Sequence, residues 1–117
     1  MITAEDMESM KCFDTVGEYS EWVESMMFTT GKDRLVENTL GLVGEAGEVA
    51  EKVKKLIRDT SKFSNEEIAK ELGDVLFYTA ALGNIYGYTL QEIIELNTKK
   101  LNSRKDRGTL KGSGDNR

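Results

Sequence analysis

The sequence predicts an all-α protein, an antiparallel four-helix bundle that is oligomeric, and three observations predict it. Proline is absent from the 117 residues. Apolar residues recur at steps of three and four over long stretches, which is the period of a helix face. Hydroxyl residues stand three positions before a glutamate at the start of three such stretches, as in a capping box. These pairs are Thr15 with Glu18, Ser64 with Glu67, and Thr89 with Glu92.

We expect the four helices at about Thr15 to Met27, Arg34 to Asp59, Asn65 to Tyr86 and Leu90 to Lys105, the second and third forming a long central hairpin. Their apolar seams include Leu42, Ala46, Val49, Val53 and Leu56 in the second helix, and Ile68, Leu72, Val75, Thr79 and Leu82 in the third. The Thr79 hydroxyl should bond back to a carbonyl in the preceding turn. Residues 1–105 are predicted to form one domain, and residues 106–117 a flexible, glycine-rich basic tail.

Hydrophobic residues make up 38% of the chain, near the low end for a globular protein. A small domain with a thin core often completes its burial by pairing with copies of itself, so we expect a homodimer or a homotetramer. No stretch approaches the roughly 18 apolar residues of a membrane span, and the acidic start lacks the apolar segment of a secretion signal. We therefore expect a cytoplasmic protein without membrane contact. The single cysteine, Cys12, agrees with a reducing compartment.

Histidine is absent, which removes imidazole bases, catalytic triads and the common zinc sites. A metal held by the remaining side chains would have oxygen ligands, which favours Mg²⁺, with Mn²⁺ as a substitute. The net charge of -5 is uneven: residues 99–117 carry seven basic and two acidic side chains, and residues 1–98 carry nine basic and nineteen acidic ones. An acidic body disfavours nucleic-acid binding, whereas the basic end suits a small phosphorylated ligand.

Two pairs of carboxylates occur at helical spacing on consecutive predicted helices: Glu45 with Glu48, and Glu71 with Asp74. At about 100° per residue, each pair falls on the same shoulder of its own apolar seam, so packing of the seams should bring all four together. Four carboxylates this close would repel one another severely unless a cation lay between them. Oxygen ligands on facing helices can hold such ions, and the sequence therefore predicts a magnesium site made by these four residues.

A single Glu-x-x-Glu in a chain with 21 acidic residues is usually only a solvated helix face, but two equally offset pairs are much harder to obtain by accident. Three glycines in the same helices, Gly44, Gly47 and Gly73, support the site. Glycine inside a helix costs up to ~1 kcal/mol and usually marks a place where backbone or ligand approaches closely.

The hairpin GLVGEAGEVAEKVKK…IAKELGDVLFYTAALG, followed by NTKKLNSRKDRG, resembles the MazG-like family of all-α nucleoside triphosphate pyrophosphatases over about residues 15–110. The family's metal-binding pattern, Glu-x-x-Glu and then Glu-x-x-Asp, is met by Glu45, Glu48, Glu71 and Asp74. The resemblance implies Mg²⁺-dependent hydrolysis of a nucleoside triphosphate, canonical or aberrant, to a monophosphate and pyrophosphate, and a dimer or a tetramer of paired dimers.

Many relatives carry a further glutamate directly before the first metal ligand, where this chain has Gly44, so a role for that residue as general base does not carry over. We expect instead a metal-bound hydroxide, oriented by Glu45 or Glu48, to attack the α phosphorus. These two are the predicted catalytic residues.

In the fourth predicted helix, Asn97, Lys100 and Arg104 form one polar stripe beside Leu101. Asn97 and Lys100 match the family's Asn-x-x-Lys, which the resemblance associates with phosphate and metal-bound water. Lysine offers phosphate a point charge and arginine a fork of donors, so all three are predicted to bind the substrate phosphates. The alternative is a basic last turn that complements the helix dipole.

Lys52 and Lys55 flank the carboxylate face of the second helix and are second-rank candidates for binding the substrate phosphates. Tyr19 and Trp22 are tentative residues for stacking on the base, although an aromatic residue at helical spacing is more often part of a core.

Two other functions stay open. One is a phosphoribosyl-ATP pyrophosphohydrolase of the same superfamily, which a substrate panel would distinguish. The other is a non-catalytic helical interaction module whose acidic face binds a partner, and such a module would release no pyrophosphate from any nucleotide.

Overall fold

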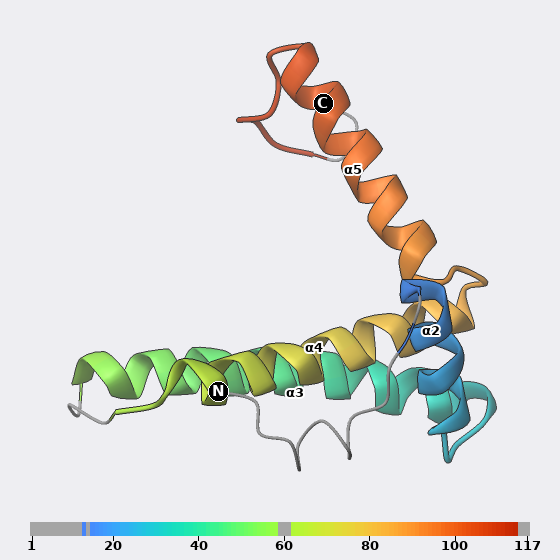
Figure 1. Ribbon diagram of the computed structural model, residues 1–117, viewed down its shortest axis with the longest axis vertical. Coiled ribbons are helices and arrows are strands. Elements are labelled where there is room, and N and C mark those ends of the chain that lie inside the picture. The colour runs from blue at the N-terminus through green and yellow to red at the C-terminus, as the bar shows by residue number, and fades with distance from the viewer. Residues whose placement is uncertain (1–12, 14, 59–61, 115–117) are drawn as a thin grey trace.

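The computed structural model describes residues 13, 15–58 and 62–114, and this part of the chain forms four helices and no strand (Figure 1). The helices are α2 (Val16–Ser25), α3 (Gly31–Arg58), α4 (Asn65–Ile85) and α5 (Leu90–Asp106). The predicted all-α class is confirmed. Helix α3 begins three residues earlier than predicted, and its predicted end at Asp59 lies outside the described residues. Within these residues, no helix is both long and apolar enough to cross a membrane.

The predicted caps start three of the helices. Ser64 and Glu67 form a complete capping box before α4, with both bonds at 3.1 Å, and Thr89 and Glu92 form a second one before α5. The Thr15 hydroxyl accepts a bond from the Glu18 amide at the start of α2. These bonds satisfy amides that the first turn of a helix leaves without a partner, which explains why the helix starts could be read from the sequence.

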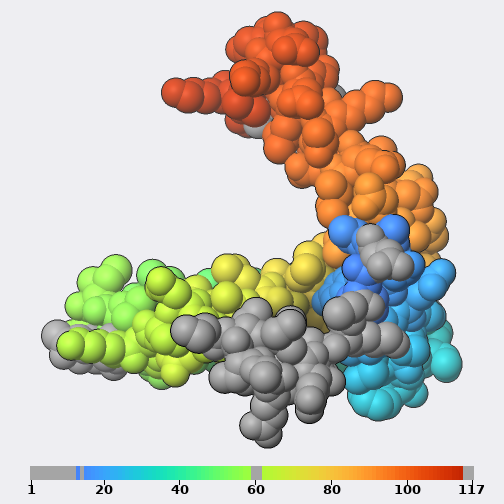
Figure 2. Space-filling view, in the orientation of Figure 1, coloured from blue at the N-terminus to red at the C-terminus, as the bar shows by residue number. Residues whose placement is uncertain are grey.

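Helices α3 and α4 lie side by side as the predicted hairpin, and α2 crosses its open end, beside the start of α3 and the end of α4 (Figure 1). Helix α5 leaves this end and projects away from the hairpin, and none of its Cα atoms comes within 8 Å of a Cα atom of α3. The described residues of one copy therefore do not form the predicted antiparallel four-helix bundle. Figure 2 shows α5 and the loop after it standing clear of the hairpin surface.

The direction of α5 follows from where its first residue is fixed. Leu90 is buried, and its amide donates to the Ser20 hydroxyl of α2 at 2.7 Å. Gly87 adopts a positive φ of 82°, and the Tyr88 amide donates to the carbonyl of Gly83 at 2.9 Å, which turns the chain outward. Because the start of α5 is fixed against α2 and the end of α4, the rest of the helix leaves the hairpin and does not close the bundle.

The core lies where α2, α4 and the start of α5 meet. Its fully buried apolar residues are Val23, Ala80, Ala81 and Leu90, with Trp22 and Phe77 among the side chains packed around them. The predicted seams of the hairpin are less buried than expected, and Leu72 remains 53% exposed. Two helices alone can cover only one side of each other. Thr79 forms the predicted bond to the carbonyl of Val75, at 2.9 Å.

The segment after α5 folds back against the helix end. The Thr109 amide donates to the Arg104 carbonyl at 2.8 Å, and Arg104 Nη2 donates to the Gly114 carbonyl at 3.3 Å. The predicted flexibility of residues 106–117 stays a prediction, and residues 115–117 lie outside the described residues.

Gly41 allows α3 and α4 to approach closely, so Gly41→Ala should destabilise the protein. A Cβ atom at Gly41 would lie 2.4 Å from the Tyr78 ring. We expect a loss of about 1–3 kcal/mol in the free energy of unfolding, measured by urea denaturation, because a packed aromatic ring must move. Gly17→Ala is the control: its Cβ would meet only the Thr15 hydroxyl at 3.6 Å, so it should be neutral or stabilising by up to ~1 kcal/mol. Equal stability of the two variants would contradict this account.

Candidate metal centre

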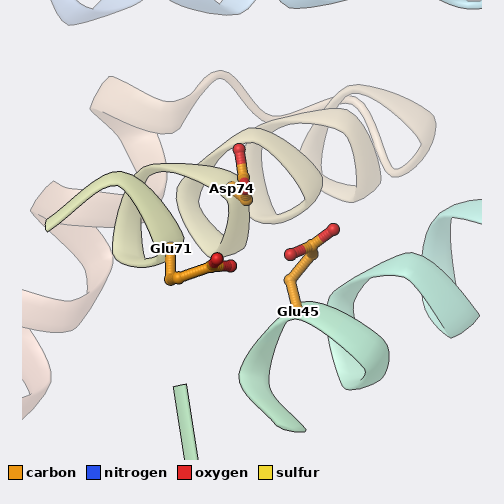
Figure 3. Close-up of side chains that lie close together, drawn as sticks. All are labelled: Glu45, Glu71 and Asp74. Carbon is orange, nitrogen blue, oxygen red and sulfur yellow. The ribbon is translucent and has the colours of Figure 1, made fainter. Parts of the chain in front are cut away.

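Three of the four predicted metal ligands come together between α3 and α4. Glu45 on α3 and Glu71 and Asp74 on α4 each offer a carboxylate oxygen, and these oxygens lie within 4.8 Å of one another (Figure 3). Glu45 and Glu71 are half-buried and Asp74 is exposed. Glu71 and Asp74 point the same way because they are one turn apart, and the antiparallel partner supplies Glu45 from the facing side.

Burial and the neighbouring negative charges raise the pKa of Glu45 above its usual range. Burial is the largest cause, followed by the negative charges of Asp74, Glu71 and Glu48 and by a side-chain hydrogen bond with Glu71. The fold therefore holds carboxylates together at an electrostatic cost, and a cation between them would remove that cost. Three oxygen donors at one edge of a helix pair fit a hard divalent ion such as Mg²⁺.

Glu48, the fourth predicted ligand, lies outside this group of three and is exposed. It remains one turn from Glu45 on the same helix, close enough for its charge to act on the pKa of Glu45. The structure thus separates Glu48 from the three clustered residues. Its predicted metal and catalytic roles stay predictions.

Lys52 contributes a positive charge to the cluster. From the sequence, Lys52 was only a second-rank candidate for a site residue. Its ammonium lies 3.8 Å from Glu71 Oε1 and 4.6 Å from the centre of the Phe63 ring. The side chains of Lys52 and Glu71 are 23% and 21% exposed. A lysine held between a carboxylate and an aromatic face is partly shielded from solvent, so its charge offsets part of the repulsion. The position of Lys52, two turns after Glu45 on the same helix, indicated that its side chain could lie near the carboxylates. Nothing in the sequence indicated that Phe63, in the loop before α4, would contact Lys52.

Tyr19 and Trp22 lie in an aromatic cluster at the end of the hairpin. Their rings are 5.7 Å apart, Trp22 meets Phe77 edge-on at 6.0 Å, and Phe77 meets Tyr78 at 5.4 Å. Trp22 and Tyr19 both pack against the core, in agreement with the alternative reading of these residues. Burial, and then the charge of Asp74, raises the pKa of Tyr19, which places this ring within electrostatic range of the carboxylates.

The predicted phosphate-binding residues lie on α5, apart from the carboxylates of the same chain. Asn97 and Lys100 are exposed on the projecting helix, whereas Arg104 is buried at 4% exposure and bonds to the Gly114 carbonyl. Arg104 therefore has a structural contact that the sequence did not predict. One copy does not bring the phosphate-binding residues to the cluster, because α5 stays away from α3.

The three glycines near the carboxylates do not mark close contacts within this chain. A Cβ atom at Gly44, Gly47 or Gly73 would meet nothing within 4 Å. The described part of the chain itself does not approach these three positions, and the expected approach of a ligand stays a prediction. Close approach within the chain occurs instead at Gly41, against Tyr78, and at Gly83, against Ile93 and the carbonyl of Tyr88.

Comparison with known proteins agrees with this geometry. Residues 34–109 match the MazG nucleotide pyrophosphohydrolase domain family, a range that contains all three clustered carboxylates. The chain is also 49% identical over 83 residues to the Gene 37 protein of Mycobacterium phage L5, an alignment covering 68% of this chain and 73% of the phage protein. No solved structure matches the chain.

Glu45→Gln should change how the stability of the metal-free protein depends on pH. The pKa of Glu45 is higher in the folded than in the unfolded state, so the folded state binds more protons between the two values. The contribution of the Glu45 carboxyl to the stability of the folded state is therefore lost as the pH rises above 4.5, the ordinary pKa of a glutamate. In EDTA, we expect the Tm of the glutamine variant to rise relative to that of the wild type as the pH is raised from about 4 to about 7. Parallel Tm curves would contradict a raised pKa of Glu45 in the folded state.

Lys52→Met should destabilise the metal-free protein and strengthen Mg²⁺ binding, because the ammonium offsets the carboxylate charge and competes with the ion for Glu71. We expect a loss of at most ~1 kcal/mol in EDTA, since both groups are partly solvated, and a several-fold lower Kd for Mg²⁺ by calorimetry. Lys54→Met is the matched control, because Lys54 pairs with Glu51, 3.0 Å away, on the exposed side of α3. Unchanged Mg²⁺ affinity in Lys52→Met would remove Lys52 from the site.

Proposed function

Since this chain belongs to the MazG nucleotide pyrophosphohydrolase family, we propose that it hydrolyses nucleoside triphosphates, ribo- or deoxyribo-, to the monophosphate and pyrophosphate with the help of Mg²⁺. The observation that carries the proposal is the convergence of Glu45, Glu71 and Asp74. Such a reaction serves to clean or remodel a nucleotide pool. Mn²⁺ is expected to substitute for Mg²⁺ because it accepts the same oxygen ligands.

Glu45, Glu71 and Asp74 hold the ion in this proposal. A bound divalent ion offsets phosphate charge and makes a coordinated water more acidic. Glu48 stands one turn from Glu45 and outside the cluster, so its carboxylate is free of the ligand set and can orient the attacking water and accept its proton. The water oxygen forms a bond to the α phosphorus, the bond from that phosphorus to the bridging oxygen breaks, and pyrophosphate leaves.

The base is proposed to lie against the aromatic cluster. A hollow of about 300 Å³ adjoins Tyr19, and Leu76, two residues after Asp74, is part of its wall. The other lining residues are Phe13, Thr15, Val16 and Leu90. A flat aromatic ring beside an apolar hollow suits stacking of any base, which supports Tyr19 and leaves Trp22, with its contacts to Phe77, in a supporting position.

Pyrophosphate release from a panel of ribo- and deoxynucleoside triphosphates, with Mg²⁺ and with EDTA, tests the proposed function. Asp74→Asn should reduce kcat/KM at least ~100-fold, because a negative ligand is replaced by a neutral one of the same shape. Glu51→Gln, which alters a carboxylate on the same helix pair but outside the cluster, is the control and should keep wild-type activity. A wild-type protein that releases no pyrophosphate, or an Asp74→Asn variant with normal turnover, would overturn the proposal.

A further inference from the structure

We infer that Lys52 binds the pyrophosphate end of the substrate, its β and γ phosphates, and stabilises the negative charge of the leaving group. This inference rests on the proposed function. It goes further by giving the nucleotide one direction along the hairpin and by assigning the leaving group a residue of α3.

The contacts of the hairpin set an order along its length. Helix α3 runs from the open end to the turn end, where α3 ends and α4 begins, and α4 runs back (Figure 1). At the open end, Tyr19 lines the hollow proposed for the base and lies within electrostatic range of Asp74. Glu71 comes one turn before Asp74 on α4, so its Cα atom lies about 4.5 Å nearer the turn end. Lys52 lies two turns after Glu45 on α3, in the same direction, and its ammonium is 3.8 Å from Glu71 Oε1. From the open end to the turn end, the order is therefore base hollow, carboxylates and Lys52.

The side chain of Lys52 reaches back along its helix to the carboxylates. Side chains of a helix lean towards its N-terminus, which for α3 is the direction of Glu45. The centre of the Phe63 ring lies 4.6 Å from the ammonium, and only 23% of the Lys52 side chain is exposed. A positive charge that is partly shielded from water acts more strongly on a neighbouring anion. Lys52 is thus held as a cation at the turn end of the carboxylate cluster.

Cleavage of the triphosphate places its two products on opposite sides of the broken bond. The nucleoside monophosphate keeps the base, and the pyrophosphate takes the bridging oxygen together with the electron pair of that bond. With the base in the hollow beside Tyr19 and the α phosphorus at the carboxylates, the pyrophosphate lies towards the turn end. Negative charge grows on it as the bond breaks, and a positioned positive charge stabilises such charge. Lys52 lies on that side of the carboxylates.

Lys52 can move from Glu71 to a phosphate without losing a hydrogen bond between the two side chains. At 3.8 Å their contact is an ion pair and is too long for a hydrogen bond. Once Glu71 ligates the ion, its carboxylate attracts the ammonium less, and the phosphates offer more negative charge. The same lysine therefore competes with Mg²⁺ in the protein without nucleotide and favours phosphate binding once Mg²⁺ is bound.

Calorimetry with the two products tests this assignment. Protein saturated with Mg²⁺ is titrated with inorganic pyrophosphate and, separately, with the monophosphate of the best substrate in the nucleotide panel. Lys52→Met should bind pyrophosphate at least about tenfold more weakly, because a charged contact is lost, and should bind the monophosphate as the wild type does. Lys52→Arg keeps the positive charge and should retain most of the affinity for pyrophosphate. Lys54→Met is the control and should bind both products normally, because Lys54 pairs with Glu51 on the exposed side of α3.

The outcomes separate this assignment from the proposed function. Tighter binding of Mg²⁺ alone together with weaker binding of pyrophosphate in Lys52→Met would support it, because a lysine that only pairs with Glu71 would change the first and not the second. If the wild type releases pyrophosphate from a nucleotide but Lys52→Met binds pyrophosphate normally, or loses affinity for both products equally, the assignment of Lys52 is wrong and the proposed function stands. If the wild type releases no pyrophosphate from any nucleotide, the proposed function fails and the assignment fails with it.

Discussion

The carboxylates of Glu45, Glu71 and Asp74 repel one another, and much of the neighbouring structure can be understood from the way this repulsion is tolerated. The α3–α4 hairpin fixes their oxygens within 4.8 Å, and the raised pKa of Glu45 records the cost. Gly41 lets the two helices approach closely around Tyr78, one turn before Glu45 on α3 and one turn after Asp74 on α4. Lys52, lodged between Glu71 and the Phe63 ring, offsets part of the charge. A divalent ion bound between the three carboxylates would offset the repulsion that remains.

The same hairpin explains why one copy is open. The edge of the hairpin that carries the carboxylates is not covered by apolar side chains, and the apolar seams of α3 and α4 stay partly exposed. The buried core lies instead at the end of the hairpin where α2, α4 and α5 meet. The Arg34 guanidinium and the Glu24 carboxylate join α3 to α2 there, which lowers the pKa of Glu24. These contacts hold α2, α3 and α4 together at this end. The hairpin with its carboxylates and helix α5 extend from it in two directions.

Local features could be predicted from the sequence because each depends on neighbours along the chain. The capping boxes of Ser64 and Thr89, the Thr79 bond to the carbonyl of Val75, and the pairing of Glu71 with Asp74 all follow from helical spacing. The direction of α5 could not be predicted in this way, since it depends on the long-range bond between Leu90 and Ser20. The sequence also did not show which helix glycine meets its own chain: Gly44, Gly73 and Gly41 all lie inside helices, but of these three only Gly41 faces an aromatic ring.

Lys100, which we propose to bind the substrate phosphates, lies on α5 and apart from the carboxylate of Glu45 on α3. Lys52, on the same helix as Glu45, already contacts Glu71, and a lysine held there competes with the ion for the carboxylate. The outward direction of α5 keeps Lys100 away from Glu45 on α3 of its own chain. Within one copy, the carboxylates of the hairpin and the basic side chains at the end of α5 are therefore held apart and do not neutralise each other's charge.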